Sequence, residues 1–339
     1  MRSKLAGLLV SALVGFVLCS SATAQTDAEW QKVVQAAKKE GKVVLYTGAL
    51  GSSSHKEIGL AFEKKYGIRF EVLEARASEL RERIRTEQVA GRFIGDVNHT
   101  GSTTTSLMLK DGNLQPLGPV PNAKNLAALF VADEYRVPSY VLRYGILINT
   151  ELVKPADEPE SWKDLLDSRW KGKILSDDTR ALGGGSVFFM VMYDTFGREF
   201  HEKLAAQEPV FTRDMRNAER RVAQGEYPLY SPELLGFYIL LKGLPVKYIV
   251  PKEGSPYIRY DLTLLKNAPH PNAARLFINY FLETESQVVL ANEGIGPTVK
   301  GVIERANPAL REMLGAKVLG TTVAERQNEM LELAKKIYK

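Results

Sequence analysis

VVLYTGALGSSSHKEIGLAFEKKYG, residues 43–67, predicts a strand, a turn of small residues and a helix in immediate succession. The β-branched and aromatic run 43–46 is typical of a buried central strand. From Glu57 onward apolar residues recur at helical spacing, and Gly67 stands where a left-handed cap ends a helix. The serines at 52–54 therefore lie at or near a helix N-terminus, whose free amides suit a polar or anionic ligand. A plain capping loop is the simpler explanation of this segment taken alone.

The first residues have the features of a cleaved export signal. Two basic residues precede an apolar run, and Ala22 and Ala24 form the small-residue pattern after which a signal peptidase cleaves. We therefore expect a signal peptide over residues 1–24 and a periplasmic mature protein. Cleavage removes Cys19, the one cysteine of the chain, so disulfides and thiol chemistry are excluded from the mature protein.

Length and charge predict a globular protein of two ordinary domains. The 45 basic residues nearly balance the 40 acidic ones, and the net charge is only +5. Basic and acidic residues are interspersed, as on solvated helix faces, and no basic stripe with interleaved aromatic residues is present in the sequence. We therefore expect no nucleic-acid partner.

Two further polar turns precede predicted helices. In GDVNHTGSTTTSLML, a short strand is expected to end at Val97, residues 99–103 to form a polar turn and a helix to begin at Thr103. In SDDTRALGGGS, three glycines before an apolar helix over 187–196 let backbone amides approach a ligand. In an open α/β sheet such turns, at the carboxyl ends of strands, face one crevice.

Two extended segments are expected to cross between two lobes, namely residues 135–150 and the return segment 246–250. Ser78 is the expected N-cap of a charged helix. Ser231-Pro232-Glu233 is expected to open another helix, with a hydroxyl at the N-cap and proline at the first helical position. A glutamate there usually complements the helix dipole, although it could accept a ligand amine.

The order of these pieces resembles the bacterial solute-binding proteins of ABC importers, in the bilobal type II group that includes ferric-iron-binding proteins. The resemblance is carried by VVLYTGALGSSSHKEIGLAFEKKYGI, GDV, YGILINTELV, SWKDLLDSRWKGKI, VAQGEYPL, PKEGSPY and KNAPHPNAARLFINYFLETESQ. It implies an α/β fold of two lobes, each a central sheet flanked by helices, joined by crossing hinge strands. It also implies closure around a ligand that is delivered to an ABC permease in the inner membrane.

The expected lobe limits follow from the two crossings. Lobe 1 is predicted over residues 25–136 and again over 251–300, and lobe 2 over 137–250. The helices of residues 301–339 are not assigned to a lobe. We expect a monomer that needs no cofactor or metal and is not an enzyme.

In the family that the sequence resembles, polar turns and crossing strands supply the ligand contacts. Hydroxyls and helix amides would fix an anionic group, arginines would add charge, and tyrosines would wall the cleft. The candidate ligand-binding residues are Tyr46, Ser52, Ser53, Ser54, Thr100, Gly101, Ser102, Thr103, Tyr140, Arg143, Arg180, Gly184, Gly185, Ser186, Tyr230 and Ser231.

Both arginines also have simpler explanations. Arg180 could pair only with Asp177 or Asp178, a surface arrangement of little energetic value. Arg143 could cover a lobe face instead of lining the cleft. Either arginine, if free, suits a carboxylate or a phosphate.

The predicted ligand is a small polar organic anion: a carboxylate, a phosphonate or a phosphorylated compound. Iron-binding members of the group present adjacent tyrosines shortly after the segment that matches VAQGEYPL, whereas this chain continues YSPELLGFY. A ferric-iron carrier that uses Tyr140 or Tyr144 is the alternative. An exported enzyme on the same scaffold is an alternative of another class, although the chain has no G-x-S-x-G, phosphate-loop or HExxH motif. Delivery to a sensor instead of a permease is also open.

Overall fold

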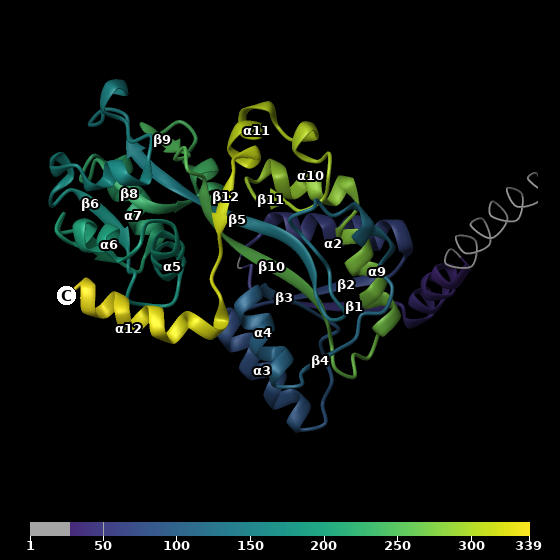
Figure 1. The fold of residues 1–339 in the computed structure, drawn as a ribbon. Helices are drawn as coiled ribbons and strands as arrows, with labels where there is room; N and C mark the ends of the chain where they lie inside the picture. The colour runs from purple at the N-terminus through teal and green to yellow at the C-terminus, as the bar shows by residue number, and fades with distance from the viewer. Residues whose placement is uncertain (1–27, 50) are drawn as a thin grey trace, which may run out of the picture.

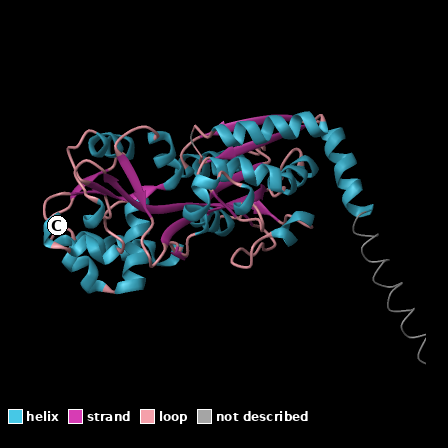
Figure 2. Ribbon diagram, turned by 90° about the horizontal axis from the view of Figure 1, so that it is seen from above, coloured by secondary structure: helices cyan, strands magenta, loops and turns pink. Residues whose placement is uncertain are grey.

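The computed structural model describes residues 28–49 and 51–339 and shows two α/β lobes joined by long strands (Figure 1). The predicted signal peptide lies outside the described residues. Viewed from above, the strands run through the middle of both lobes with helices around them (Figure 2). In spatial order the strands of the shared sheet are β2 (Arg69–Glu74), β1 (Lys42–Thr47), β3 (Val97–Gly101), β10 (Ser255–Leu265), β5 (Val137–Asn149), β8 (Leu229–Leu234), β6 (Ile174–Asp177) and β7 (Val210–Thr212).

Lobe 1 is organised around β1, as the opening stretch of sequence predicts. β1 pairs in parallel with β2 on one side and with β3 on the other. Successive side chains of a strand point to opposite faces, so Val43 and Leu45 enter one core and Val44 and Tyr46 enter another. The helices of this lobe are residues 28–40, α2 (Ser53–Tyr66), α3 (Ala77–Val89), α4 (Ser102–Lys110), α9 (Pro271–Phe281), α10 (Thr284–Asn292) and α11 (Pro308–Gly315).

The two faces of the lobe 1 sheet are covered by different helices. α2, α9 and α10 contribute to the core that contains Leu45, through residues such as Phe62 and Phe277. α3 and α4 contribute to the core that contains Tyr46, through Leu80 and Met108. Short strand β4 (Leu114–Gln115) pairs with the end of β10. The carboxyl ends of β1 and β3 are thus fixed between two packed layers.

Lobe 2 repeats this arrangement with a smaller sheet. Ile146 and Ile148 of β5 enter a core formed with α5 and α6, whereas Leu147 faces α7. Short strand β9 (Val246–Ile249) pairs with β5. The helices of this lobe are α5 (Gly184–Phe196), α6 (Arg198–Ala205), α7 (Met215–Ala223) and α8 (Leu235–Tyr238), the last of which packs against β5.

Strands β5 and β10 are the two hinge strands. β5 pairs with β10 as far as Arg143 and with β8 and β9 from Tyr144 onward, so one strand serves both lobes. This confirms the predicted crossing at 135–150. The predicted return crossing at 246–250 is wrong, because β9 stays in lobe 2 and the chain returns through β10. Short strand β11 (Gly296–Pro297) also pairs with β5.

The C-terminal residues belong to both lobes. α11 packs in the lobe 1 core, whereas α12 (Gln327–Ile337) packs on α5 and α6 through Met330, Ala334 and Tyr338. Residues 316–326, which we call the C-terminal strap, connect them and include β12 (Val318–Gly320), which pairs with β10. The strap is the yellow segment that descends between the lobes in Figure 1. It is a third connection between the lobes, besides the two hinge strands.

Three local predictions are wrong. Residues 99–101 belong to strand β3, not to a turn, because they pair with β10. Ser231 and Glu233 belong to strand β8, not to a helix start, because Ser231 pairs with Ser176 and Glu233 with Gly145. The helix α3 begins at Ala77, before Ser78, because the Glu79 side chain accepts a hydrogen bond from the backbone at its N-cap.

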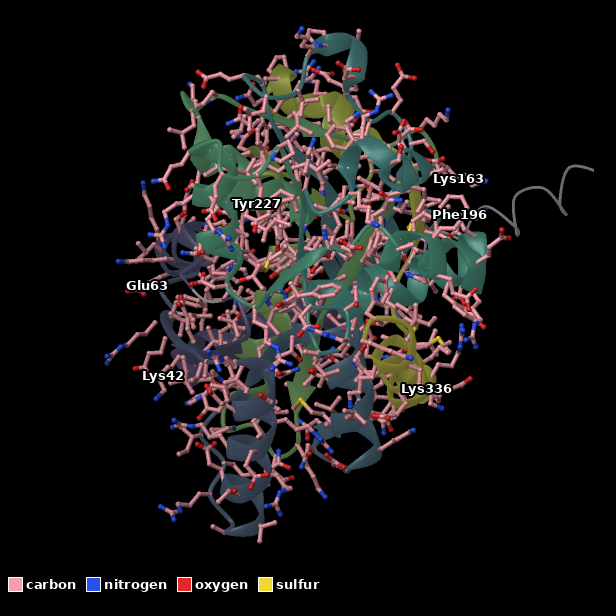
Figure 3. All side chains as sticks on the ribbon, turned by 90° about the vertical axis from the view of Figure 1, so that its left-hand side faces the viewer. Lys42, Glu63, Lys163, Phe196, Tyr227 and Lys336 are labelled. Atoms are coloured by element: carbon pink, nitrogen blue, oxygen red, sulfur yellow. The ribbon has the colours of Figure 1, made fainter. Side chains whose placement is uncertain are left out.

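The surface is populated by charged side chains, as the composition predicts. Lys42, Glu63 and Lys336 extend outward, and Lys163 lies over the ring of Phe196 with its Nζ 5.0 Å from the ring centroid (Figure 3). Within residues 28–49 and 51–339, no helix combines the length and the apolar composition that crossing a membrane requires.

Candidate functional site

Two helices of lobe 1 begin side by side at the carboxyl ends of β1 and β3. Thr47 pairs with His99, and the Gly48 amide donates to the His99 carbonyl across 2.9 Å. Neither α2 nor α4, which follow these strands, has a side-chain hydrogen bond from its N-cap residue or an acidic residue in its first turn. Their first amides therefore have no N-cap side chain as acceptor and suit an anion, while at the α2 end the carboxylates of Glu74 and Glu293 accept from the Gly51 amide and the Ser53 hydroxyl.

Other long helices in the described part of the chain are capped differently. The first turn of α3 contains Glu79, and the N-terminus of α9 is covered by Glu40, whose carboxylate accepts from the Ala273 amide at 2.7 Å. Asp214 caps α7 through the Asn217 amide. The open N-termini of α2 and α4 are thus a local feature of the place where lobe 1 meets the hinge strands.

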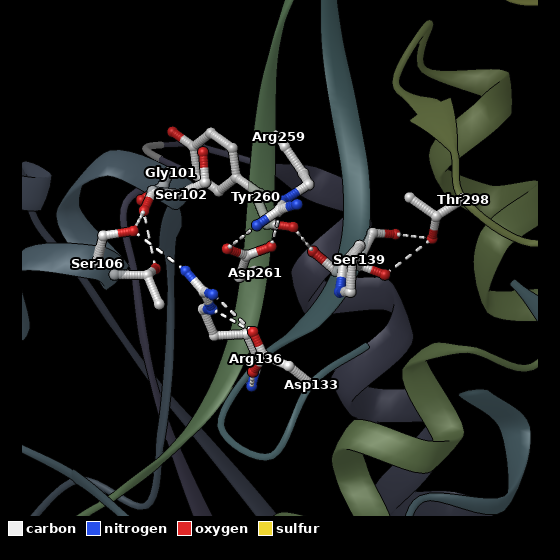
Figure 4. A network of polar contacts seen from close by, with 12 residues as sticks. Gly101, Ser102, Ser106, Asp133, Arg136, Ser139, Arg259, Tyr260, Asp261 and Thr298 are labelled. Carbon is white, nitrogen blue, oxygen red and sulfur yellow. Dashed lines mark hydrogen bonds and ion pairs between the residues drawn. The ribbon is translucent and has the colours of Figure 1, made fainter. Parts of the chain in front are cut away.

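Tyr260 of hinge strand β10 borders this place. It pairs with Gly101 and stacks on Tyr140, with ring centroids 4.8 Å apart. A Cβ atom at Gly48 would lie 3.6 Å from Thr100 Cγ2 and 3.8 Å from Tyr260 Cε1. Figure 4 shows the Tyr260 ring beside Gly101 and Ser102, above the ion pair of Arg259 with Asp261. Glycine at position 48 therefore lets the turn after β1 pass within contact distance of Thr100 and the Tyr260 ring, beside both helix N-termini.

A hydrogen-bonded chain of buried side chains connects the serine turn to both hinge strands. Ser52 Oγ lies 2.6 Å from His55 Nδ1, and His55 Nε2 lies 2.9 Å from His99 Nδ1. His99 Nε2 lies 2.7 Å from Oγ of Ser139 in β5, and that hydroxyl donates to the Tyr260 carbonyl of β10 at 2.9 Å.

This chain has one direction that satisfies every contact. The Tyr260 carbonyl can only accept, so Ser139 donates to it and accepts from Nε2 of His99. His99 Nδ1 then accepts from His55 Nε2, and His55 Nδ1 accepts the Ser52 hydroxyl proton. Burial lowers the pKa of His55 to about 4 and the pKa of His99 well below its usual value, so both rings are neutral at pH 7. The Ser52 proton is therefore not available to a ligand.

The remaining serines and threonines of lobe 1 are engaged to different degrees. Ser54 Oγ lies 2.9 Å from Ser52 Oγ, and the Ser53 hydroxyl donates to the carboxylate of Glu293. Thr103 bonds Thr322 of the strap at 3.1 Å. Ser102 uses its carbonyl to accept from Ser106. Its hydroxyl makes no bond to another described residue, so it is the best-placed hydroxyl donor beside the two helix N-termini.

Lobe 2 presents a different kind of helix N-terminus. The amide of Gly185, in the first turn of α5, donates to Oδ2 of Asp177 at 2.7 Å. A Cβ atom at Gly184 would lie 2.9 Å from both Asp177 Oδ2 and the Tyr144 hydroxyl. Ser186 Oγ exchanges hydrogen bonds with the backbone of Gly183. A buried carboxylate therefore already neutralises the positive end of α5.

Further acidic and hydroxyl groups are buried on strand β8 of lobe 2. Glu233 is fully buried on β8, and within the described residues neither of its carboxylate oxygens has a hydrogen-bond partner. The same is true of the hydroxyls of Tyr230 and Ser231. Burial, reinforced by the nearby charge of Glu219, raises the pKa of Glu233 well above its usual value. Lobe 2 thus presents buried carboxyl and hydroxyl groups without partners, whereas lobe 1 presents the backbone donors of two helix N-termini.

The two candidate arginines are both engaged. Arg143 is 8 % exposed and donates from Nη1 to the Ala316 carbonyl of the strap at 2.7 Å. Arg180 donates from Nε to Asp178 at 2.8 Å, and its guanidinium lies 4.5 Å from the centroid of the Phe211 ring. Among the described residues, neither arginine forms a hydrogen bond or ion pair with the first turn of α2 or α4.

Tyr46 lies apart from the other candidates. It is 1 % exposed in the core between β1 and α3, and its hydroxyl donates to the Glu87 carboxylate at 3.1 Å. Side-chain alternation along β1 directs it to the face opposite Thr47. We therefore leave Tyr46 out of the site that we propose.

The structure brings the candidates together in two groups. Ser52, Ser54, Thr100–Thr103 and Tyr140 gather at the ends of β1 and β3, and Gly184–Ser186, Tyr230 and Ser231 gather around β6 and β8. Sequence reasoning missed His55, His99 and Tyr260, and it interpreted Glu233 as a helix-capping residue. A proline directly before Glu233 favoured the wrong secondary structure, and nothing in the sequence shows that two histidines 44 positions apart touch.

Comparisons with known proteins identify the family and the fold of the chain. Residues 23–288 match the family described as bacterial extracellular solute-binding protein. The chain belongs to this family. An uncharacterized protein of Haemophilus influenzae is 28 % identical over 159 residues, which are 44 % of this chain and 46 % of that protein, so the match spans about half of that relative. A putative 2-aminoethylphosphonate-binding periplasmic protein of Salmonella typhimurium is 23 % identical over 254 residues, covering 71 % of this chain and 72 % of the relative.

The fold of this solute-binding protein is also found in solved structures. Iron-bound HitA from Pseudomonas aeruginosa superimposes with a TM-score of 0.71 and 21 % identity, covering 87 % of this chain and 99 % of HitA. The bilobal α/β fold that the sequence predicts is confirmed. The family that the chain matches consists of solute-binding proteins and not of enzymes, which argues against the exported-enzyme alternative.

Proposed function

We propose that this solute-binding protein is exported to the periplasm, captures a small organic anion between its lobes as a monomer and delivers it to an ABC permease. The anionic group would be held by the first amides of α2 and α4 and by the Ser102 hydroxyl. The observation that carries the proposal is the pair of open helix N-termini at the adjacent ends of β1 and β3. Such a pair binds a carboxylate, phosphonate or phosphate through amide donors and dipoles.

The name of one relative supports the same ligand class. The Salmonella typhimurium relative is described as putatively binding 2-aminoethylphosphonate, whose phosphonate is a compact anion with several acceptor oxygens. Three oxygens on one phosphorus suit amides that converge from two helices. Among the three predicted anion types, a phosphonate therefore has the most direct support.

The hinge strands provide the mechanism of capture. β5 pairs with lobe 1 strands in its first half and with lobe 2 strands in its second half, so a change of backbone angle near Arg143 and Tyr144 swings the lobes. A ligand that contacts both lobes stabilises the closed state by the difference between its affinities for the closed and the open state. The turn at residues 52–54 would move with the hinge strands. The hydrogen-bonded side chains that run from Ser52 to Ser139 and Tyr260 connect this turn to both strands.

A ferric-iron carrier is the second candidate. HitA binds iron on the same fold, and Tyr144 and Tyr230 lie with Asp177 and Glu233 in lobe 2, which is a set of oxygen ligands suited to Fe(III). The arrangement differs from the adjacent tyrosine pair that the family resemblance implies for iron. Burial among carboxylates also raises the pKa of both phenols, which opposes the phenolate form.

Titration calorimetry tests the proposal directly. Protein freed of endogenous ligand by partial unfolding and refolding is titrated with ethylphosphonate, 2-aminoethylphosphonate and Fe(III). We expect a phosphonate to bind with unit stoichiometry and Ser102→Ala to weaken it about tenfold, which corresponds to one hydrogen bond to a charged group. Ser106→Ala is the matched control, because the Ser106 hydroxyl donates to the carbonyl of Ser102. Binding of Fe(III) without any organic anion would contradict the proposal.

A further inference from the structure

The ligand of this protein carries a positively charged amine as well as its anionic group, we propose, and Glu233 of lobe 2 binds that amine. The inference rests on the proposed function and specifies the other end of the ligand. The substrate class would then be a short zwitterion, such as an aminoalkyl phosphonate or an amino acid. The anion would lie on the helix N-termini of lobe 1 and the ammonium on lobe 2.

The first observation is the state of the Glu233 side chain. It is 0 % exposed, and neither carboxylate oxygen has a hydrogen-bond partner among the described residues. A buried carboxylate without partners is costly, since it loses its hydration and gains nothing in return. Protonation alone does not remove the cost, because the new O–H donor would also lack an acceptor. A buried carboxyl group in this state is suited to a ligand that brings hydrogen-bond donors.

A second and independent group is in the same condition. The Tyr230 side chain, on the same strand, is 0 % exposed, and its hydroxyl has no partner among the described residues. Glu233 pairs with Gly145 of the hinge strand, where a Cβ atom would lie only 2.7 Å from the Tyr248 hydroxyl. Glycine at 145 thus keeps the hinge strand close to Glu233 with no side chain between Glu233 and Tyr248.

The charge around Glu233 favours a cation. Glu219 is 2 % exposed, and its Oε1 also has no partner among the described residues. The guanidinium of Arg216 contacts Glu219 Oε2 at 3.2 Å and lies 3.7 Å from the centroid of the Phe237 ring, so it is already engaged.

An ammonium group can supply donors to unpartnered oxygens of this kind. It carries three N–H groups, and both oxygens of Glu233 and the hydroxyl of Tyr230 lack a partner among the described residues. A second anionic group would meet the acidic side chains of Glu233 and Glu219, and an apolar group would leave their unpartnered oxygens without donors. Because lobe 1 would bind the anionic group and lobe 2 the amine, the protein would select a ligand with opposite charges at its two ends.

Calorimetry with a matched pair of ligands tests the inference. 2-Aminoethylphosphonate and ethylphosphonate share the phosphonate and differ in the amine. We expect the wild-type protein to prefer the amine at least about tenfold, and Glu233→Gln to weaken 2-aminoethylphosphonate at least about 30-fold, as for loss of one partner of a buried charge pair. Ethylphosphonate binding should stay within about twofold. Tyr230→Phe should give a smaller loss in the same direction.

The controls separate this inference from the proposed function. Glu226→Gln removes an exposed carboxylate of lobe 2 and should change neither affinity. Thermal unfolding of each variant shows whether it is folded, and ethylphosphonate binding by Glu233→Gln shows that its lobe 1 site is intact. Equal wild-type affinities for the two phosphonates would overturn the amine site and leave the proposed function standing. Failure of both phosphonates, or Fe(III) binding that Tyr230→Phe abolishes, would contradict both.

Discussion

His55 and His99 form a direct hydrogen bond, with His55 Nε2 2.9 Å from His99 Nδ1, in the buried layer between α2 and the hinge strands. Two imidazoles in contact cannot both be protonated at this distance without strong repulsion. Their neutrality makes each ring a donor at one nitrogen and an acceptor at the other. The pair therefore transmits the orientation of Ser52 to Ser139 and Tyr260 without carrying charge.

Both histidines should be the tautomer protonated at Nε2. This follows from the Tyr260 carbonyl, which fixes the direction of every donor in the chain. Nitrogen-15 NMR of labelled protein at pH 7 distinguishes a protonated ring nitrogen from an unprotonated one. We expect the Nδ1 atoms of His55 and His99 to resonate as unprotonated nitrogens. A protonated Nδ1 in His99 would show that the chain runs the other way.

The stability of lobe 1 should fall as the pH drops from 6.5 to about 4. The pKa of His55 is lowered to about 4 in the folded protein, whereas an unfolded histidine titrates near its ordinary value of 6.5. Between these values the unfolded chain binds more protons, so acid favours unfolding by about 3 kcal/mol for this one group. Urea unfolding at pH 7, 5.5 and 4.5 measures the loss, and His55→Asn should reduce it.

The control for this experiment is His201 of lobe 2. Burial also lowers the pKa of His201 to about 4, and its ring bonds the Tyr338 hydroxyl at 2.8 Å. His201→Asn should therefore flatten the pH profile to a similar extent but leave ligand affinity unchanged. His55→Asn should weaken ligand binding as well, because Ser52 loses its acceptor. Equal ligand affinity in both variants would show that the chain has no role at the site.

The two glycines that begin α5 should differ in their tolerance of alanine. At Gly185 a Cβ atom would lie 2.6 Å from the backbone C and O of Asp178, which cannot move without shifting β6. At Gly184 the nearest atoms are side-chain atoms of Asp177 and Tyr144 at 2.9 Å. We expect Gly185→Ala to cost about 3 kcal/mol and Gly184→Ala about 1 kcal/mol. Chemical denaturation gives both values, and the reverse order would contradict the packing described for this turn.

Arg143 should contribute to the stability of the fold, and Arg180 should contribute little to phosphonate binding. Arg143→Ala removes a buried charged donor to the Ala316 carbonyl, so the free energy of unfolding should fall by about 2 kcal/mol. Arg180→Ala breaks a partly exposed pair with Asp178 and should change phosphonate affinity less than twofold. Calorimetry and urea unfolding of both variants provide the test. A large loss of phosphonate affinity in Arg180→Ala would show that Arg180 binds the anionic group.

The last helix should be needed for the stability of lobe 2. Met330 is 4 % exposed in the core that α12 forms with α5 and α6. Met330→Ala should lower the free energy of unfolding by about 3 kcal/mol through the cavity it leaves. Lys336, which extends outward from the same helix, gives the control Lys336→Ala, and that variant should unfold like the wild type. Hydrogen exchange would show whether the loss is confined to lobe 2.

Local patterns predicted most of the fold. The run 43–46, the helical spacing after Glu57 and Gly67 together fixed the first strand and helix, and Gly67 has the expected left-handed φ of 69°. The errors came where local chemistry and sheet pairing disagree. Ser231-Pro232-Glu233 has the composition of a helix start, but pairing with Ser176 and Gly145 keeps it extended. Pairing partners distant in sequence cannot be inferred from one chain.

The candidate site was predictable in outline only. Polar turns after strands pointed to the correct regions of lobe 1 and lobe 2. The sequence could not show that Arg143 bonds the strap or that Tyr46 faces the opposite core. It also gave no sign that Glu233 is buried without a partner, because that depends on how four segments of lobe 2 meet. The role of each site residue therefore depends on its tertiary contacts more than on the sequence motif that contains it.

The C-terminal strap makes the end of the chain a reporter of lobe movement. α12 packs on lobe 2 after the chain has left α11 in lobe 1, so a fluorophore attached after Lys339 would move with lobe 2. A second fluorophore at Lys42, exposed on lobe 1, would complete an energy-transfer pair without touching either ligand group. Ligand binding would then change the efficiency of energy transfer between the two fluorophores, which can be measured on single molecules.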